Sequence, residues 1–290
     1  MKVVRDAGEL APGPRVVTLG TFDGVHLGHR RVLAATREAE PDLRSTVVTF
    51  APHPREVLGN QVELLTTLPR RLELLEEEGV DETLVVEFTP ELASTGPEAF
   101  VEGLLRPIET RRVVAGADFR FGHRRSGDLD LLEGLGFEVT RVELVQGVSS
   151  SVIRELLRGG DVAGAARLLG RPAEVEGTVV SGDARGGTLG FPTANLRPER
   201  DLLVPGYGIY AGSASGHRAA VSIGTNPHYG GSERRVEAFL LDFEGDLYGR
   251  RLVVELWQRL RDEQAFGNEA ELVEQIARDV EATRRAAPPL

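Results

Sequence analysis

The sequence has no cysteine, and this absence excludes several kinds of chemistry at once. Without thiols the chain forms no disulfide, offers no thiolate to a metal and has no cysteine nucleophile. Basic residues are also scarce: 34 lysines and arginines stand against 45 acidic residues, which gives a net charge of −11. Because a general nucleic-acid binder shows a basic patch or stripe, we expect no nucleic-acid partner. An anionic nucleotide in a locally positive pocket is still compatible with this charge.

Long apolar runs are missing as well. No hydrophobic stretch approaches the length of a membrane span, so we expect no membrane partner. The amino-terminal residues contain no signal-peptide core, which favours a cytoplasmic enzyme. The 290 residues, 41% hydrophobic and 27% charged, are typical of an ordinary globular protein with two domains. The sequence predicts no oligomeric state.

The first half alternates β-rich runs with helical patterns. The runs cover residues 15–19, 46–50, 83–88, 111–115 and 138–145, and the helical patterns begin after His29, at Pro69, near Pro97 and after Ser126. This alternation predicts an α/β domain whose mostly parallel sheet is covered by helices on both faces. Ligands of such sheets bind beyond the carboxyl ends of the strands. The segments that follow the strands are therefore the candidate ligand contacts.

Residues 20–29 are the segment around which the first half is organised. They follow an apolar run and precede a helical pattern, which predicts a strand, a glycine-bearing turn and a helix start. His26 and His29 lie three residues apart at the helix entry and so share a face. Free backbone N–H groups and the positive end of the helix dipole favour a phosphate there, and Gly28 leaves the backbone open to a ligand. The alternative is a helix start with two surface histidines.

Three further segments at the same predicted sheet edge are polar. Residues 49–54 hold His53 between two prolines in a stiff turn. Residues 116–128 combine three glycines with charges of both signs, which suits a polyanion and sugar hydroxyls. Residues 149–154 predict a hydroxyl-rich helix start with Arg154 about one turn in, a second phosphate-type site. The alternatives are a rigid connector, a solvated loop and an ordinary serine cap.

The second half has a different pattern after Pro172. Short β-rich runs cover residues 173–180, 208–214, 218–223, 236–243 and 251–259, with glycine-rich turns between them. These runs predict a small antiparallel barrel. Asp161 is the predicted cap of a helix that ends before Pro172. Residues 269–285 predict an amphipathic helix that closes the chain.

Two features of the second half carry chemistry. If residues 192–196 are extended, Thr193 and Asn195 point to the same face, where their oxygens suit Mg²⁺ and phosphate. The glycines of residues 186–190 would cradle a nucleotide. Glu237 stands in an otherwise apolar strand as either a paired charge or a general base for a hydroxyl nucleophile. The alternatives are an Asn/Thr turn between barrel strands and a satisfied carboxylate at the barrel mouth.

Both halves resemble the modules of one known family. The His-Leu-Gly-His sequence of residues 26–29, with Gly-Thr-Phe-Asp-Gly upstream, is similar to the HxGH superfamily of nucleotidyltransferases. Adding the segments 49–54, 116–128 and 149–154 narrows this similarity to FAD synthetases. The riboflavin kinase patterns are visible in residues 190–195, 205–211, 222–227, 236–238 and 260–266. The chain thus resembles the bacterial bifunctional riboflavin kinase/FAD synthetase (FMN adenylyltransferase) family over nearly its whole length.

The resemblance implies the fold, the domain limits and the reactions. A Rossmann-like nucleotidyltransferase domain over residues 1–170 would carry the FAD synthetase activity. A small antiparallel β-barrel with a C-terminal helix, over residues 171–290, would carry the riboflavin kinase activity. ATP and Mg²⁺ would serve both steps, in which riboflavin is phosphorylated to FMN and FMN is adenylylated to FAD with release of pyrophosphate. The expected partners are therefore the small molecules riboflavin, FMN and ATP.

The resemblance also implies roles for individual residues. His26, His29 and Arg154 would act on the ATP phosphates in adenylyl transfer, while Glu237 would deprotonate the ribityl hydroxyl of riboflavin. Nucleotide or phosphate contacts are implied at Gly20, Phe22, Asp23, Gly28, Ser150, Ser151, Gly186, Gly190, Thr193 and Asn195, of which the last two would also hold Mg²⁺. Flavin contacts are implied at His53, Asp118, Arg261, Glu263 and Phe266. Trp257 is expected to pack in the core rather than stack on the flavin.

Three positions depart from the family pattern. Ser151 and His228 stand where threonine is usual, and Gly187 stands where many relatives have arginine. Ser151 keeps the hydroxyl, whereas Gly187 would leave one phosphate contact missing. Two alternatives to the bifunctional enzyme follow. One is an FMN adenylyltransferase with a weak kinase module, and the other is a flavin-binding regulatory protein with degenerate sites.

Overall fold

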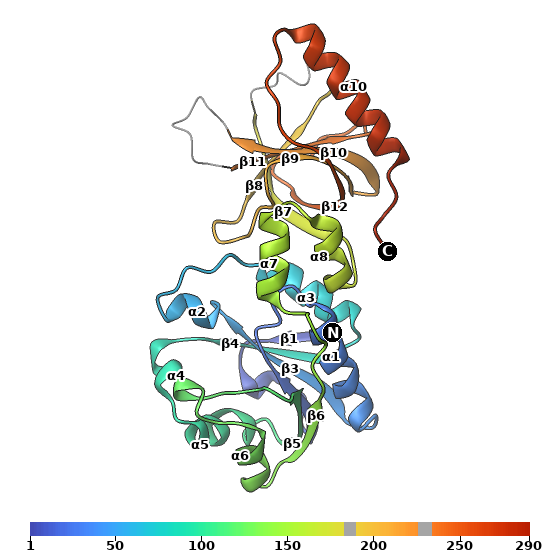
Figure 1. Ribbon diagram of the computed structural model, residues 1–290. Helices are drawn as coiled ribbons and strands as arrows, with labels where there is room; N and C mark the ends of the chain where they lie inside the picture. The colour runs from blue at the N-terminus through green and yellow to red at the C-terminus, as the bar shows by residue number, and fades with distance from the viewer. Residues whose placement is uncertain (183–189, 226–233) are drawn as a thin grey trace. The chain divides into compact units, whose positions relative to one another are not determined.

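The computed structural model describes residues 1–182, 190–225 and 234–290. Its internal contacts divide the chain into two compact units, Met1–Ser149 and Ser150–Leu290 (Figure 1). The predicted domain limit after residue 170 falls later, behind two helices (Ser150–Arg158 and Val162–Leu169) that open the second unit. That limit stays a prediction, and the two units are described separately.

A six-stranded parallel sheet forms the centre of the first unit. Its strands are β1 (Lys2–Val4), β2 (Arg15–Leu19), β3 (Arg44–Ala51), β4 (Glu82–Glu87), β5 (Thr110–Gly116) and β6 (Glu138–Val142). Their order is β1-β4-β3-β2-β5-β6, and every neighbouring pair is parallel. The five predicted strands are confirmed, although β6 ends at Val142 instead of residue 145. The edge strand β1 has no predicted counterpart, because three residues are too few to show an alternating pattern.

Helices cover both faces of this sheet, as predicted. They are α1 (Leu27–Ala39), α2 (Pro54–Val57), α3 (Leu68–Glu77), α4 (Pro90–Ser94), α5 (Pro97–Phe100) and α6 (Leu129–Gly134), with short 3-10 turns η1 (Ala7–Glu9) and η3 (His123–Arg125). The helix predicted from Pro97 is shorter than expected in its α-helical part. It continues as the π-helical turn η2 (Val101–Leu105), which stops before Pro107.

The alternation of side chains along the strands builds a core on each face. Val47 of β3 packs with Leu33 of α1 and Leu75 of α3. Its neighbour Val48 points to the other face and packs in the cluster that contains Phe100 of α5. Full burial of such a side chain contributes about 1.5–3 kcal/mol. Figure 1 shows α1 and α5 on opposite sides of the sheet, so the strand ends are the part that the helices leave open to a ligand.

The chain reverses its direction across the sheet between β2 and β5. From β2 it moves outward through β3 to β4, and it then returns to β5, which pairs with β2, before it continues to β6. Ligands of open α/β sheets bind at such a reversal, outside the carboxyl ends of the strands. Residues 20–29 follow β2 and residues 116–128 follow β5. Two of the predicted site segments therefore meet at the reversal, and residues 49–54 follow β3 at the same edge.

The second unit joins two helices to a closed antiparallel barrel. The helices are α7 (Ser150–Arg158) and α8 (Val162–Leu169), and the strands are β7 (Ala173–Val180), β8 (Ala194–Pro198), β9 (Gly208–Ala214), β10 (His217–Thr225), β11 (Arg234–Leu240) and β12 (Arg251–Arg261). The barrel order is β10-β11-β8-β7-β12-β9. The predicted barrel is confirmed, and so is the Asp161 cap, whose carboxylate accepts the Gly164 N–H.

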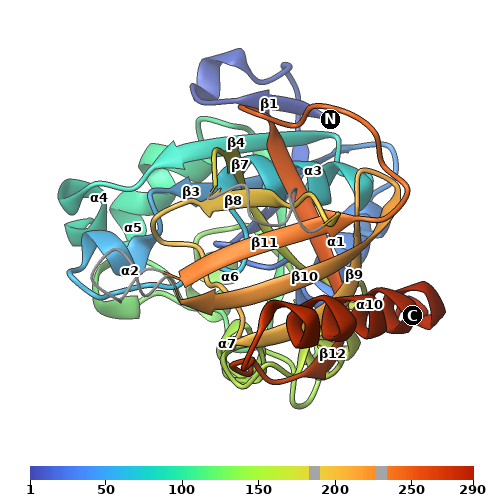
Figure 2. The same ribbon diagram turned by 90° about the horizontal axis from the view of Figure 1, so that it is seen from above.

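The last helix lies on the outside of the barrel. This helix, α10 (Glu269–Arg285), has the predicted limits and packs along β9 and β10 (Figure 2). Among the described residues, no helix combines the length and the apolar character that a membrane crossing requires.

Candidate active sites

The two histidines of residues 20–29 form a stacked pair at the start of α1. His26 is the N-cap of this helix, and its Nδ1 accepts a hydrogen bond of 3.3 Å from the backbone N–H of His29. The two rings lie 3.6 Å apart, centroid to centroid, at an angle of 13°. A Cβ on Gly28 would lie 3.2 Å from the His26 ring, so glycine there leaves room for the stack. The predicted placement of both imidazoles on one face is confirmed.

The loop before this pair has an unusual backbone that a buried carboxylate supports. Phe22 and Val25 have φ angles of 49° and 37°, in the left-handed region that side chains other than glycine rarely adopt. The carboxylate of Asp23 is buried and accepts backbone N–H groups of Leu65 at 2.9 Å and Thr66 at 3.1 Å. The resemblance implied an ATP contact at Asp23. The structure shows its oxygens on backbone donors, where they fix the loop, and the ATP contact stays a prediction.

The electrostatic setting of His29 favours its neutral form. Burial lowers the pKa of His29 well below its usual value of 6.5, and the nearby His26 and Arg71 lower the pKa further. The Phe22 ring covers one edge of the imidazole at a centroid distance of 5.2 Å. Within the described part of the chain, the buried Nδ1 of His29 has no hydrogen-bond partner. An unsatisfied ring nitrogen beside a helix N-terminus suits a phosphate oxygen.

Arg71 is a residue of this site that the sequence analysis missed. It lies on α3, is 2% exposed, and its Nη1 donates to the carbonyl of Thr21 at 2.6 Å. The spacing offered a signal, because Arg71 lies three and four residues before Leu74 and Leu75 and therefore shares their buried face. A charged residue on the buried face of a helix needs a partner or a function.

The other expected residues of the first unit also lie at the carboxyl edge of the sheet. His53 follows β3 as the N-cap of α2, and its buried ring accepts the Arg55 N–H at 3.1 Å. Asp118 is exposed in the turn after β5. Farther along the same segment, the Phe121–Gly127 bridge closes residues 122–126 into a loop. The proline turn and the glycine loop are therefore placed where the sequence predicted them.

The serine-rich helix start is confirmed as α7. Ser150 and Ser151 occupy its first turn, and Arg154 follows one turn later with a buried side chain. Ser150 and Arg154 lie four residues apart and so share a face of the helix. By its contacts α7 belongs to the second compact unit.

A second polar cluster links β8 and β11 on the barrel. Asn195 pairs in register with Glu237. The hydroxyl of Thr193 donates to Glu237 Oε2 at 3.2 Å. Arg235 Nε lies 2.9 Å from Glu237 Oε1 and donates to Asn195 Oδ1 at 3.1 Å. The structure thus brings the three predicted residues together, and it adds Arg235, which the sequence analysis missed.

The face of β11 explains how Glu237 is tolerated in an apolar strand. Val236, Ala238 and Leu240 are buried, while Arg235 and Glu237 alternate with them on the partly exposed face. The i, i+2 spacing of arginine and glutamate was therefore a signal for their pairing. Near the cluster, a Cβ on Gly182 would come within 2.2 Å of Asn195 Nδ2, so only glycine leaves room for this amide.

Some predicted positions of this cluster cannot be placed. Gly186, Gly187 and His228 lie outside the described residues. Gly190 is described and has a φ of 86°.

The oxygen atoms of the barrel cluster fit a magnesium ion that shares its ligands with phosphates. A threonine hydroxyl, an asparagine amide and a carboxylate are all oxygen donors of the kind Mg²⁺ prefers. In the described ranges, no three histidine, aspartate or glutamate side chains are grouped as metal ligands. Since Mg²⁺ usually keeps waters and substrate phosphates among its ligands, the residues present suit an ion that arrives with ATP.

The expected flavin residues of the barrel lie at the end of β12 and directly after it. The guanidinium of Arg261 makes a bidentate pair with Asp279 of α10, with Nη2–Oδ2 at 2.7 Å and Nε–Oδ1 at 3.0 Å. It also lies 5.9 Å from the centre of the Phe266 ring. Glu263 packs on Gly224, where a Cβ would come within 1.9 Å of its carboxylate. Arg261 and Phe266 therefore lie close together, and the guanidinium of Arg261 also anchors α10 through Asp279.

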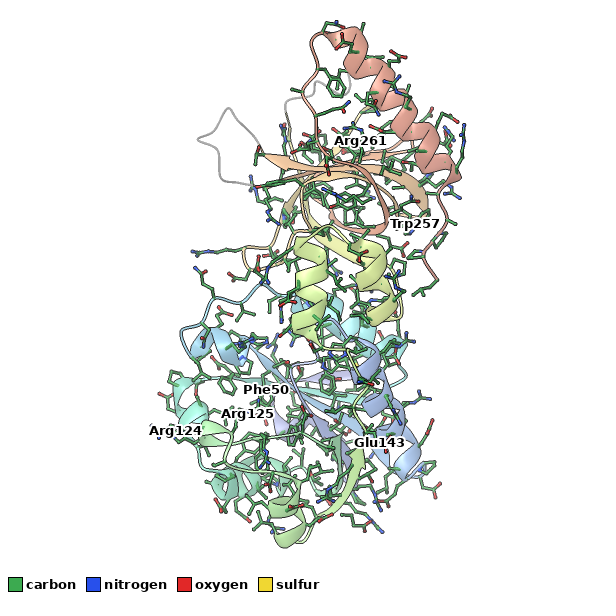
Figure 3. All side chains as sticks on the ribbon, in the orientation of Figure 1. Phe50, Arg124, Arg125, Glu143, Trp257 and Arg261 are labelled. Carbon is green, nitrogen blue, oxygen red and sulfur yellow. The ribbon has the colours of Figure 1, made fainter. Side chains whose placement is uncertain are left out.

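Trp257 packs in the core, as expected. Its ring is 7% exposed, lies in a cluster with Ala211 and Ala286, and donates from Nε1 to Glu255 at 2.8 Å. Arg218 lies over the same ring at 5.3 Å. Figure 3 labels Trp257 and Arg261 at separate points of the second unit.

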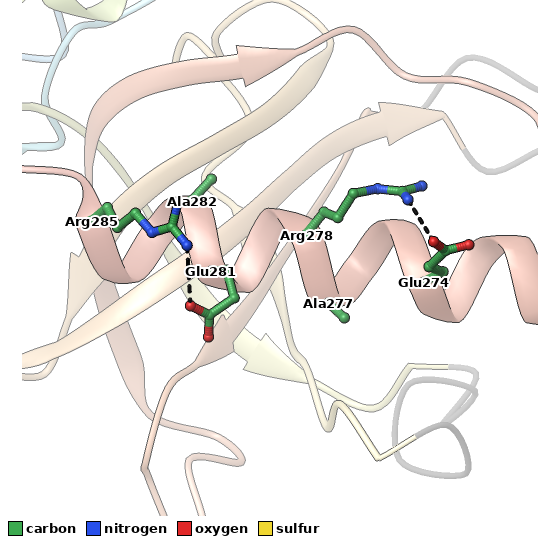
Figure 4. A pocket seen from close by; sticks show the side chains of 6 residues that line it. All are labelled: Glu274, Ala277, Arg278, Glu281, Ala282 and Arg285. Atoms are coloured by element: carbon green, nitrogen blue, oxygen red, sulfur yellow. Dashed lines mark hydrogen bonds and ion pairs between the residues drawn. The ribbon is translucent and has the colours of Figure 1, made fainter.

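A shallow hollow on the outer surface of α10 carries no comparable chemistry (Figure 4). Its lining comes from successive turns of one helix: Glu274, Ala277, Arg278, Glu281, Ala282 and Arg285. The charges pair along the helix, Arg278 with Glu274 at 2.8 Å and Arg285 with Glu281 at 3.9 Å. Exposed pairs of this spacing contribute only about 0.3–0.5 kcal/mol each. The hollow is therefore an ordinary helix surface.

Comparisons with known proteins find relatives over nearly the whole chain. The family model described as FAD synthetase matches residues 9–155, and the model described as riboflavin kinase matches residues 169–287. Bifunctional riboflavin kinase/FMN adenylyltransferases from Listeria monocytogenes and Escherichia coli are 37% and 38% identical to the chain. The alignments cover 93% and 96% of this chain and 91% and 96% of those proteins. A solved structure described as a macrolide-efflux protein from Streptococcus pneumoniae is 31% identical with a TM-score of 0.89, and the match covers 98% of this chain and 99% of that one.

Proposed function

The chain belongs to the family of bifunctional riboflavin kinase/FMN adenylyltransferases, and we propose which of its residues carry each reaction. As a member of this family it phosphorylates riboflavin to FMN and adenylylates FMN to FAD, with ATP as the donor and Mg²⁺ as the metal. Riboflavin, FMN and ATP fit as its small-molecule substrates. A cytoplasmic location and the absence of nucleic-acid and membrane partners are proposals from the sequence alone.

We assign adenylyl transfer to the stacked pair of His26 and His29. In this reaction an FMN phosphate oxygen bonds to the α-phosphorus of ATP, the bond from that phosphorus to the α–β bridging oxygen breaks, and pyrophosphate leaves. No protein nucleophile is needed, so the protein positions the phosphates and donates hydrogen bonds where negative charge grows. The observation that carries the assignment is the buried Nδ1 of His29 beside the helix N-terminus, which has no partner within the described residues.

The remaining residues of this reaction have supporting roles in the proposal. The match to the FAD synthetase model extends to residue 155 and so covers the start of α7, which supports the phosphate contacts proposed there. Asp23 positions the loop through the backbone of Leu65 and Thr66. The further phosphate contacts are Gly20, Phe22, Gly28, Ser150, Ser151 and Arg154. His53 and Asp118 are proposed for the flavin because they follow β3 and β5, the neighbours of β2.

We assign phosphoryl transfer to the cluster on β8 and β11. Glu237 accepts the proton of the terminal ribityl hydroxyl, whose oxygen bonds to the γ-phosphorus of ATP while ADP leaves. Thr193 and Asn195 would hold Mg²⁺ together with the phosphates, and the ion would neutralise phosphate charge. Arg235 orients the carboxylate and the amide through its contacts of 2.9 and 3.1 Å. Arg261, Glu263 and Phe266 are proposed to lie near the flavin ring, with Arg261 fixing Phe266.

A pair of variants tests this division of labour. Glu237→Ala should lower FMN formation from riboflavin by about 100-fold or more, because it removes the general base, and should leave FAD formation from added FMN within about twofold. His29→Ala should do the reverse. Riboflavin or FMN is supplied with ATP and Mg²⁺, and the flavin products are separated by chromatography. The activity that each variant keeps shows that the other unit is intact, and circular dichroism with thermal melting is the control for folding of the substituted unit.

The outcomes also separate the alternatives. Equal loss of both activities in either variant refutes the assignment to separate residues. Wild-type protein that makes FAD only from added FMN corresponds to the adenylyltransferase with a weak kinase module. Absence of product from both flavins supports the regulatory protein and contradicts both enzyme assignments.

A further inference from the structure

We propose that Arg71 is a positioning residue for adenylyl transfer: it fixes the backbone entrance of residues 20–29 and places a permanent positive charge beside the histidine pair. The inference rests on the assignment of His26 and His29 made above, since Arg71 acts through them. No part of the two proposed reactions otherwise uses this buried arginine.

One guanidinium ties together the ends of two central strands. Nη1 of Arg71 donates to the Thr21 carbonyl at 2.6 Å and lies 3.4 Å from both Thr49 Oγ1 and the Phe50 carbonyl. The Thr49 hydroxyl donates to the same Thr21 carbonyl at 3.3 Å. Thr21 follows β2, and Thr49 and Phe50 belong to the end of β3 (Phe50 is labelled in Figure 3). Arg71 thus connects the exits of the strands that carry two of the predicted site segments.

The clamped carbonyl lies directly before the strained part of the loop. Phe22, the next residue, has a φ of 49°, a conformation that costs roughly 1–3 kcal/mol and persists only where the surroundings hold it. Its ring packs edge-on against His29. Fixing the Thr21 carbonyl therefore helps to fix the Phe22 ring and, through it, the orientation of the His29 imidazole.

The charge of Arg71 is incompletely compensated inside the protein. Arginine stays protonated in proteins, and its side chain is 2% exposed here. Asp23 is near enough to act on it electrostatically, but the Asp23 oxygens also accept backbone N–H groups of Leu65 and Thr66. Among the described residues, the Nε of Arg71 has no hydrogen-bond partner. An anion bound at the neighbouring helix start would lower the energy of such a buried cation.

The charge of Arg71 also affects the pKa of His29, which a purely structural role of Arg71 would not change. Burial, His26 and Arg71 all lower the pKa of His29, while Asp23 is the acidic group that faces Arg71 from the loop. Because its pKa is lowered, His29 stays neutral at pH values where a free imidazole would be protonated. Removal of the Arg71 charge therefore raises the pKa of His29, and the acid limb of the pH profile of FAD synthesis should move to higher pH.

The test uses Arg71→Lys, Arg71→Gln and Arg71→Met in the full chain. We expect the Gln and Met variants to lose about tenfold or more in kcat/KM for FAD synthesis from FMN, because a charged hydrogen bond to the loop is gone. They should also bind inorganic pyrophosphate more weakly in calorimetry and show the shifted acid limb. The Lys variant keeps the charge and the position of the acid limb, but it lacks the planar fork and recovers only part of kcat. Circular dichroism and thermal melting of each variant report whether the first unit is folded, and riboflavin kinase activity, unchanged within about twofold, shows that the second unit is intact.

Two results would overturn the inference. One is a Gln variant with wild-type kcat/KM and wild-type pyrophosphate affinity. The other is equal loss in the Lys, Gln and Met variants with an unmoved acid limb, which assigns Arg71 to packing only. His29→Ala is measured in parallel: if it keeps full FAD synthesis, the histidine assignment itself has failed. If it loses activity while the Arg71 variants keep theirs, only the role of Arg71 is refuted.

Discussion

His26 and His29 share a face because of their spacing in a helix, and that much follows from the sequence. The spacing does not reveal that the His26 ring turns back to cap α1 or that the two rings stack at 3.6 Å. It also gives no sign of the burial that lowers the pKa of His29. Arg71 escapes prediction because its hydrogen-bond partners Thr21, Thr49 and Phe50 lie on other elements. The contact of Arg235 with Asn195 escapes it for the same reason, since β8 and β11 come together only once the barrel has folded.

The lowered pKa of His29 makes folding stability depend on pH. In the unfolded chain His29 titrates near its usual value of 6.5, whereas in the folded protein it stays neutral to lower pH. Below 6.5 the unfolded state therefore binds more protons, so stability present at neutral pH is lost as the pH falls toward the folded pKa. Denaturant unfolding measured at several pH values should show this loss in the wild type and a smaller loss in His29→Gln. Parallel pH dependence in the two proteins would contradict the prediction.

At the level of the elements, local sequence patterns predicted most strands and helices, but they missed strands whose own sequence is a weak strand former. The strand Arg15–Leu19 and the helix Glu269–Arg285 have the predicted limits because apolar alternation and helical spacing are strong there. Strand β8 was not among the predicted runs, since its Ala-Asn-Leu-Arg-Pro sequence has few residues that favour strands. It forms because β7 and β11 pair with it on both sides.

A buried ion pair joins the starting ends of two strands in the first unit. Arg15 opens β2 and Glu82 opens β4, and their charged groups meet at 2.7 Å with both side chains almost fully buried. Ala11 links to both, since its N–H donates to Glu82 at 3.1 Å and its carbonyl accepts from Arg15 at 2.5 Å. The pair lies at the opposite edge of the sheet from the proposed site, which points to a structural role.

Arg15→Met should lower the free energy of unfolding by about 3–5 kcal/mol, because it leaves the Glu82 carboxylate buried and unpaired. The double variant Arg15→Met with Glu82→Leu should recover much of the loss, since it removes both charges. Denaturant unfolding of the single and double variants measures the difference. Arg278→Met, which breaks an exposed pair on α10, is the matched control and should cost less than about 1 kcal/mol. A comparable loss in both single variants would contradict the distinction.

For the molecule as a whole, the two modules and their order could be predicted from the sequence, whereas the side-chain contacts are known only from the structure. The parallel sheet and the barrel could be predicted because each has its own pattern and the motifs occur in the order of the family. The hydrogen bonds of Asp23 to backbone donors and of Arg261 to Asp279 could not be predicted. A sequence motif identifies a residue but does not identify its contacts in the folded chain. The flavin assays test whether Gly187 and His228 weaken the kinase, since they measure FMN formation from riboflavin directly.

Magnesium should be required for both activities and not for the fold. Among the residues that the structure describes, no group of acidic or histidine side chains forms a metal cage, so the ion contributes little to folding. Chelation with EDTA should abolish FMN and FAD formation and leave the melting temperature of the free protein within about 2 °C. Both activities should return when Mg²⁺ is added back. A melting temperature that falls by many degrees on chelation would indicate a structural metal.

The closed barrel and the open sheet expose the two units to different risks of aggregation. The barrel strands pair in a ring, whereas the sheet ends in β1 and β6, whose outer edges could pair with another chain. Both edge strands are short, and β6 carries Glu138 and Arg141. Short, charged edge strands discourage such pairing in the native state. When heating loosens the fold, edge-to-edge association should begin in the first unit, whose sheet keeps two open edges. Because both units belong to one chain, the precipitate should carry the kinase out of solution together with FAD synthesis.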